Sequence, residues 1–348
     1  MKLPMSMPIC IQFFSVGCGD AIALRFLGTD NQYHNFFINA GYSSTYRTTI
    51  QKELIAIEKR QETVDLWCIT HTDEDHISGI KTFLKDPSFA NKQDIVKHFW
   101  FNWSDYPAPD DSSKISIRSG VTLRDYIQLA YRLHQQDITA EMPVFDFYGA
   151  KITILSPDKS KLEVSKIAWQ KEEFSKKISS SNDHNQTVPE LLQQEFEEDD
   201  SIPNGSSIAF LFEYNGTKLL FLADSHPSVI ETSLRRLGFS ETHKLKVNWI
   251  KVAHHGSKKN TSPKFLDLID CANFVISADG IRQDLPDKVT LAKILSSRNG
   301  ALTHFWFTHK TPTLENIFAV DGANIHNIYP FECHYPEVGA HALRIEIP

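Results

Sequence analysis

Four residues with metal-binding side chains lie close together early in the chain. They are His71, Asp73, Asp75 and His76, and they directly follow the apolar run 64–70, whose length and composition are typical of a buried strand. Imidazole nitrogens and carboxylate oxygens bind divalent cations such as Zn²⁺ and Mn²⁺. If the chain turns sharply after the strand, these side chains converge and hold a metal. The alternative is a polar loop whose Asp residues cap the next helix.

Two later strand ends also carry residues of ligand type. Asp224 follows the apolar strand 219–223, and His254 and His255 follow the predicted strand 247–253. Each has a simpler explanation, because Asp224 could cap the next helix and the histidines could be a hydrogen-bonded structural pair. Together, however, the three strand ends supply enough nitrogen and oxygen donors for two divalent ions.

The elements expected around these residues come in two successive rounds. We expect strands at 11–16, 21–26, 34–38 and 64–70 with helices at 48–59 and from Ile77, and then strands at 208–214, 218–223, 247–253 and 274–277 with helices at 227–237 and 288–298. Such a pattern predicts two β-sheets packed face to face with helices outside, a four-layer αββα sandwich of the mixed α/β class. We expect a single domain over 1–348.

The segment 157–203 differs in composition from the rest of the chain. It is rich in Lys, Glu, Ser, Gln and Asp and ends near the acidic run 195–200. We predict a polar, partly helical and mobile insertion that is solvated rather than a domain. A lid or a partner-binding surface is the alternative.

Composition and charge set limits on the class of protein. With 41% hydrophobic and 23% charged residues, the chain can bury a substantial core. The net charge of −7 neither supports nor excludes a nucleic-acid substrate. The five cysteines are scattered without a C-x-x-C pair, which indicates reduced thiols. The N-terminus is too weakly apolar for a secretion signal, and no run approaches the roughly 20 apolar residues of a membrane helix. We therefore expect a cytoplasmic protein with no membrane contact.

Other histidines and tryptophans are expected to have structural roles. Five histidines without ligand-like spacing are predicted to be surface or core residues: His304, His309, His326, His334 and His341. Five tryptophans in apolar runs are predicted to lie in the core: Trp67, Trp100, Trp103, Trp249 and Trp306.

The order of the motifs resembles the metallo-β-lactamase superfamily. The resemblance rests on V-G-C-G-D-A at 16–21, H-x-D-x-D-H at 71–76, the strand ending in Asp224, and H-H-G-S at 254–257. The most similar branch is the hydrolase domain of competence-type DNA-uptake channels and their free-standing soluble relatives. The resemblance extends from about Ile11 to the helix ending near residue 298, without the insertion.

This resemblance implies two divalent metal ions, Zn²⁺ or Mn²⁺, and a set of ligands. The implied ligands are His71 and Asp73 for one ion, Asp75 and His76 for the second, Asp224 between them, and His255 completing the second site. His254 is a close alternative to His255, or a substrate contact. In such relatives a hydroxide that bridges the metals attacks a phosphoester or an acyl carbon.

Three positions depart from the pattern of these relatives. Asp73 stands where the superfamily usually has His, and an oxygen donor shifts the preference from Zn²⁺ towards Mn²⁺ or Mg²⁺. Asn39 stands where relatives often carry an Asp that orients the ligands. Leu285 replaces the His of a His-Pro-Asp-Lys segment, which removes a phosphate contact or proton donor.

We predict a metal-dependent hydrolase, and more specifically a phosphodiesterase or nuclease acting on a nucleic acid or nucleotide. The expected catalytic residues are Asp75, His254, Ser257 and Lys258. The turn 256–259 adds backbone donors, a hydroxyl and two cations beside the metals, as a phosphate-bearing substrate requires. A solvated basic turn is the simpler interpretation.

Two other functions fit the same residues. One is a hydrolase for a thioester, a lactone or a β-lactam, which the acidic net charge slightly favours. The other is a catalytically degenerate scaffold that binds a protein partner in a multi-protein defence or signalling system. Asn39 and Leu285 favour the scaffold, whereas the ligand residues favour an enzyme.

Overall fold

The computed structural model of the protein describes residues 9–104, 115–131, 137–171 and 182–348. Within these residues the strands form two large sheets and one small one. The first sheet contains, in spatial order, β16 (Ala342–Ile347), β1 (Ile9–Phe14), β2 (Ile22–Leu27), β3 (Tyr33–Ile38), β4 (Val64–Ile69) and β5 (Phe99–Phe101). The second contains β15 (Phe331–His334), β14 (Thr303–Phe307), β13 (Asn273–Ile276), β11 (Trp249–Lys251), β9 (Thr217–Phe221), β8 (Ala209–Tyr214), β7 (Ala150–Ser156) and β6 (Phe145–Phe147). The small sheet pairs β10 (Leu245–Lys246) with β12 (Ile269–Asp270).

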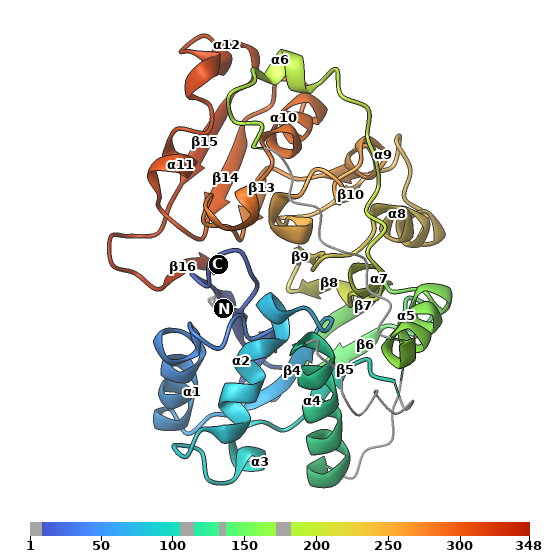
Figure 1. The fold of residues 1–348 in the computed structure, drawn as a ribbon, viewed down its shortest axis with the longest axis vertical. Coiled ribbons are helices and arrows are strands. Elements are labelled where there is room, and N and C mark those ends of the chain that lie inside the picture. Colours follow the sequence, from blue (N-terminus) through green and yellow to red (C-terminus); the bar gives the residue numbers. More distant parts are fainter. Residues whose placement is uncertain (1–8, 105–114, 132–136, 172–181) are drawn as a thin grey trace, which may run out of the picture.

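Helices lie on the outer sides of the two large sheets (Figure 1). Those beside the first sheet are α1 (Ile50–Lys59), α2 (Glu74–Lys85), α3 (Lys92–Ile95) and α4 (Ile115–Tyr131). Those beside the second are α8 (Pro227–Arg236), α9 (Pro263–Asp267), α10 (Lys288–Ser297), α11 (Pro312–Glu315) and α12 (Ile325–Ile328). Between β7 and β8 lie α5 (Lys159–Lys171), α6 (Val188–Leu191) and α7 (Ile202–Gly205). Short 3₁₀ helices are η1 (Tyr46–Thr48), η2 (Ala253–Gly256), η3 (Arg282–Asp284) and η4 (Ala319–Asp321). None of the helices in these described parts combines the length and the apolar character needed to cross a bilayer.

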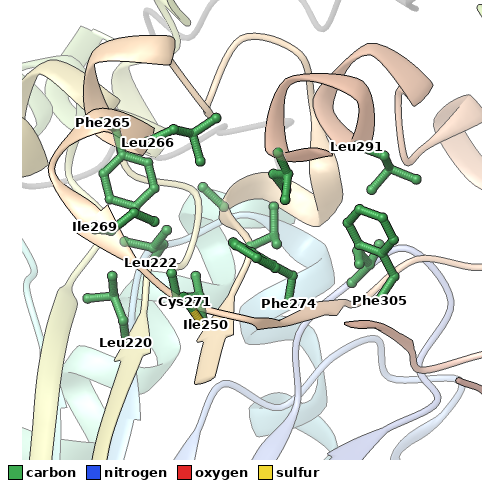
Figure 2. Packing of buried hydrophobic residues seen from close by; sticks show 14 of the residues in the cluster. Leu220, Leu222, Ile250, Phe265, Leu266, Ile269, Cys271, Phe274, Leu291 and Phe305 are labelled. Atoms are coloured by element: carbon green, nitrogen blue, oxygen red, sulfur yellow. The ribbon is translucent and has the colours of Figure 1, made fainter. Parts of the chain in front are cut away.

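Three buried apolar clusters separate the layers. The first lies between the sheets, where Phe36 of β3 stacks on Phe210 of β8 with ring centroids 5.4 Å apart. The second lies between the first sheet and its helices and includes Leu54 of α1. The third lies between the second sheet and its helices, where Phe274 of β13 and Leu291 of α10 belong to one packed group (Figure 2). Burying one such side chain stabilises the fold by about 1.5–3 kcal/mol. The order of helix, sheet, sheet and helix confirms the predicted four-layer αββα sandwich.

Strand direction determines where the loops gather. The strands β1, β2 and β3 form an antiparallel meander, whereas β3, β4 and β5 run parallel. In the second sheet β9, β11, β13, β14 and β15 are all parallel neighbours. The carboxyl ends of parallel neighbours meet at one sheet edge, which is where ligand sites in such sheets form. The hairpin between β8 and β9 turns at Asn215 and Gly216, both with positive φ.

The insertion at 157–203 differs from its prediction. Its residues 172–181 lie outside the described part of the chain. The described remainder is not simply solvated, because Trp169, Val188 and Leu191 are buried in the apolar clusters. The carboxylate of Asp183 also accepts hydrogen bonds from the first two backbone N–H groups of α10. A few apolar residues spaced along a polar segment are therefore enough to fasten it to the sandwich.

Candidate metal centre

Residues from three loops meet at one edge of the sandwich. His71 lies two residues after β4, and Asp75 and His76 lie in the first turn of α2, which begins at Glu74 rather than near Ile77 as predicted. Asp224 lies three residues after β9, and His255 lies in η2, just after β11. Because β9 and β11 are parallel neighbours, their carboxyl ends bring the loops of Asp224 and His255 together. These five predicted ligands are each at most 2% exposed.

A first candidate cation position lies around His71 and Asp224. The Asp224 Oδ2 atom is 3.7 Å from His71 Nε2 and 3.3 Å from His76 Nε2, and these three side chains can offer one atom each to a single ion. Asp73 Oδ2 is 3.9 Å from His71 Nε2. On another side, His254 Nε2 is 3.7 Å from Asp224 Oδ2. We call this group of His71, Asp73, Asp224 and His254 the first position.

A second candidate position lies beside the first. Asp75 Oδ2 is 3.7 Å from His76 Nε2 and 3.1 Å from His255 Nε2, and these three side chains can also converge on one ion. His255 Nε2 lies 3.8 Å from Asp224 Oδ2. We call Asp75, His76 and His255 the second position. Asp224 contacts both groups, which is the place that the resemblance assigns to a bridging carboxylate.

Several polar atoms of this centre fit a cation better than they fit the protein around them. His71 Nε2, His76 Nε2 and Asp224 Oδ1 are buried and have no hydrogen-bond partner among the described residues. Leaving a buried polar atom unpaired costs about 1–3 kcal/mol. A divalent ion would satisfy these atoms, and nitrogen with carboxylate oxygen is a donor set that Zn²⁺ and Mn²⁺ accept. The residues therefore fit a metal centre.

The charge states of Asp224 and His71 suit a metal. Burial would raise the pKa of Asp224, but the neighbouring imidazoles of His76 and His254 hold that pKa well below its usual value. Burial, reinforced by His76, lowers the pKa of His71 well below its usual value. An ionised carboxylate and a neutral imidazole are the forms in which these side chains bind metals. Burial would lower the pKa of His76, but Asp224 and Asp75 raise it to about 9, so a bound metal would have to displace a proton from this ring.

The ring of His71 is oriented by a hydrogen-bond chain behind it. Asn39 Oδ1 accepts hydrogen bonds from the Thr70 backbone N–H at 2.9 Å and from the Thr70 hydroxyl at 3.1 Å. Because this hydroxyl donates to Asn39, its oxygen can accept from His71 Nδ1, which lies 3.0 Å away. The proton of His71 then sits on Nδ1, and Nε2 presents its lone pair to the first position.

The same Asn39 has the opposite effect on His76. The Thr70 backbone N–H fixes Oδ1 of Asn39, so the Nδ2 amide group faces His76 Nδ1 at 2.8 Å. An amide N–H can only donate, so His76 Nδ1 accepts and the ring proton sits on Nε2, the atom that a cation requires. An Asp at this position would accept from His76 Nδ1–H instead. The departure at Asn39 thus leaves the ring held in place, but in its neutral form the ring favours a proton on Nε2 that a bound cation would have to displace.

His254 is held from behind by residues that the sequence did not reveal. Its Nδ1 lies 2.9 Å from Asn260 Oδ1 and 3.6 Å from Asp199 Oδ2, and Asn204 Nδ2 is 3.4 Å away. The Nδ2 group of Asn260 donates to Asp199 and to the backbone oxygen of Asp224, so its Oδ1 accepts from His254. Burial would lower the pKa of His254, but Asp224 and Asp199 raise it to about 9. Asp199 comes from the inserted segment, whose acidic composition gave no sign of this contact.

A buried ion pair lies behind the second position. Asp20 and Lys251 contact each other through Oδ2 and Nζ, and both side chains are 1% exposed. The other oxygen of Asp20 is 3.6 Å from His255 Nδ1. Asp20 belongs to the V-G-C-G-D-A phrase at 16–21, so the motif pointed to it without giving it a role.

Unusual backbone conformations place the histidine pair. His254 and His255 have φ of 43° and 55°, in the left-handed region that side chains other than glycine seldom occupy. Gly256 follows with φ of 90°, and a Cβ there would lie 2.6 Å from Cβ of Pro286. The H-H-G order therefore reflects a tight turn that points the two imidazoles to different positions.

Two of the predicted catalytic residues, Ser257 and Lys258, lie next to this turn and form hydrogen bonds with residues outside the candidate centre. The backbone N–H of Lys258 donates to Asp287 Oδ2 at 2.8 Å, and Ser257 Oγ accepts from the Lys259 N–H. Leu285, expected to mark a lost polar group, is buried in the apolar cluster under the outer helices. The structure thus gathers the predicted metal ligands, whereas Ser257 and Lys258 form the margin of the site.

Comparison with known proteins complements this geometry. The sequence model of the metallo-beta-lactamase superfamily matches residues 38–280, which include every predicted ligand. No curated protein matches the chain. Among the matching solved structures is a mutant of CmlA beta-hydroxylase, with 12% sequence identity and a TM-score of 0.40. That alignment covers 99% of this chain and 55% of the hydroxylase, so this chain spans about half the length of that protein.

Proposed function

Because the chain belongs to the metallo-β-lactamase superfamily, most of whose members are metal-dependent hydrolases, we propose that it hydrolyses phosphodiester bonds in a nucleic acid or a nucleotide. The observation that supports this proposal is the pair of adjacent cation positions with Asp224 between them. Two ions about 3.5–4 Å apart are the arrangement that phosphatases and nucleases use for in-line displacement at phosphorus.

The residues divide into two groups of ligands and a margin. The first ion would be held by His71, Asp73, Asp224 and His254, and the second by Asp75, His76, His255 and the shared Asp224. When bound, such ions lower the pKa of water and stabilise charge on the attacking and leaving oxygens. The buried, ionised carboxylate of Asp224 would supply negative charge to both ions.

The margin of the site suits a phosphate group. Lys258 and Lys259 are half-buried in the turn after His255, and Lys293 of α10 interacts electrostatically with Lys258. Burial lowers the pKa of Lys293, and the nearby Lys258 cation lowers it further. Glu197 Oε1 lies 3.3 Å from Lys259 Nζ, and Asp287 offsets part of the charge of Lys293. The remaining positive charge, together with bound metal ions, would attract a polyanionic substrate despite the net charge of −7.

Metal-dependent cleavage assays test the proposal. We expect the protein with Mn²⁺ or Zn²⁺ to cleave single-stranded DNA, RNA or bis(p-nitrophenyl) phosphate, and the Asp75→Ala, His76→Ala double variant to lose this activity. The matched control is Asp267→Ala with His98→Ala, which removes an exposed carboxylate and an exposed imidazole. If wild type and the Asp75, His76 variant behave alike on all three substrates, the proposal is wrong.

A parallel panel of thioester, lactone and β-lactam substrates tests the alternative hydrolase. If the protein cleaves one of these substrates and none of the phosphodiesters, it is an acyl hydrolase and not a phosphodiesterase. A protein that binds less than about one ion per chain and cleaves neither set would be the degenerate scaffold.

A further inference from the structure

A second group of possible metal ligands lies on the edge strand of the second sheet and on its neighbour. It consists of His304 on β14 with Glu332 and His334 on β15, and it shares no residue with the candidate metal centre. The strands are parallel, with His304 opposite Glu332 and Trp306 opposite His334. Side chains on a strand alternate between faces, so these four residues share one face, opposite the buried face of Phe305.

The three donor atoms have the spacing of one face of a metal tetrahedron. His304 Nδ1 is 3.1 Å from His334 Nε2, and Glu332 Oε2 lies 3.3 Å and 3.5 Å from these two nitrogens. Zinc bonds of about 2.0–2.1 Å at tetrahedral angles place neighbouring donors about 3.3–3.4 Å apart. An ion above this triangle would meet all three ligands with little movement.

The site has rigid support and an open side. The ring of His334 stacks on Trp306, with centroids 3.8 Å apart and planes 15° apart, and Trp306 Nε1 donates to Asn273 Oδ1. His304 and His334 are each about one quarter exposed, and Glu332 is 57% exposed. Ligands carried on paired strands hold their geometry better than ligands on loops. Solvent can supply the fourth ligand.

We propose that His304, Glu332 and His334 form a separate surface site for a divalent transition metal, with Zn²⁺ as its ion. Two imidazoles and one carboxylate are a donor set that Zn²⁺ uses in proteins, with water in the remaining place. A bound ion would tie the edge strand β15 to β14. Without an ion, the two imidazoles hydrogen-bond to each other and Glu332 lies close to both, so metal binding has to be measured directly.

Cobalt absorption in the full chain tests the proposal, because Co²⁺ reports tetrahedral coordination by its visible bands. The Asp75→Ala, His76→Ala variant serves as the background, so that failure of the proposed hydrolase activity does not affect the result. We expect this background to bind one more Co²⁺ ion per chain than the same background with His304→Gln and His334→Gln. Elemental analysis after Zn²⁺ loading should show the same difference of one ion.

A matched control and a second readout keep the test decisive. His98→Gln, which removes an exposed histidine, should leave the ion count unchanged. Binding of Co²⁺ beside His334 should also quench the fluorescence of the stacked Trp306, and Trp306→Phe should remove that component without removing the ion. Equal ion counts with and without the His304 and His334 changes would overturn the proposal. So would quenching that persists after both histidines are replaced.

Discussion

The two cation positions of the candidate centre differ in what lies behind their histidines. At the first position, Thr70 and Asn260 accept hydrogen bonds from Nδ1 of His71 and His254, so the neutral form of each ring turns its Nε2 lone pair inward. At the second position, Asn39 donates to His76 Nδ1, which leaves the proton on the inward nitrogen. The types of ligand residue are therefore not sufficient to predict metal affinity, because the hydrogen bonds behind an imidazole ring decide whether it can bind a metal. We expect tight binding at the first position and weak binding at the second.

Removing the residue that joins the two positions should have the largest effect. Asp224→Ala deletes the carboxylate that contacts His71 in one and His255 in the other. A loss of about 4 kcal/mol of transition-state stabilisation corresponds to a loss of about a thousandfold in kcat/KM. Steady-state hydrolysis of bis(p-nitrophenyl) phosphate measures it, with the exposed Asp267→Ala as control. Activity within about tenfold of wild type would mean that the positions do not act together.

Breaking the ion pair behind the second position should destabilise the whole fold. Lys251→Met leaves the buried Asp20 carboxylate without its cation, and such a loss costs about 3–5 kcal/mol. Urea unfolding measures the change, with the exposed Lys246→Met as control. Adding Asp20→Asn should recover part of the lost stability, because it removes the unpaired charge. If Lys251→Met unfolds at the same urea concentration as wild type, the pair contributes nothing to stability.

Changing the groups behind the rings should alter the two affinities in opposite directions. Asn39→Asp supplies His76 Nδ1 with an acceptor and should tighten the weaker site by about 10–100-fold. Asn260→Ala removes the acceptor behind His254 and should weaken the tighter site by a similar factor of about 10–100. Chelator-competition titrations with Zn²⁺ or Mn²⁺ give both constants. If Asn39→Asp binds the ion at the second position more weakly than wild type does, the tautomer assignment is wrong.

The chelator-treated protein should show a pH dependence of stability. The pKa of His254 is raised from 6.5 to about 9 in the folded state. The folded protein holds this proton more tightly than the unfolded chain, so the stabilisation is complete below pH 6.5 and is lost as pH rises through about 9. Urea unfolding between pH 6 and 10 should show this decline. His254→Asn should reduce it without abolishing it, because Asp224 and Asp75 also raise the pKa of His76 to about 9. A decline that is identical in His254→Asn would assign it to other groups.

Sequence reasoning succeeded where the evidence is local. The run 64–70 indicated a buried strand, and β4 occupies Val64–Ile69 with all six residues buried. The spacing of His71, Asp75 and His76 predicted convergence, which the start of α2 at Glu74 provides. The insertion was harder, because its polar composition concealed the few apolar anchors and the contact of Asp199 with His254. The edge strand β15 was not predicted, so the pairing of His304 with His334 could not be either.

The sequence by itself determined the fold class and the candidate metal ligands, since strand periodicity and residue type are properties of short segments. Only the tertiary structure decided which nitrogen of each imidazole faces a cation. That choice depends on hydrogen bonds between residues far apart in the chain, such as Asn39 with Thr70 and Asn260 with Asp224. A tautomer is set by the partner behind the ring, and this partner is known only once the chain has folded.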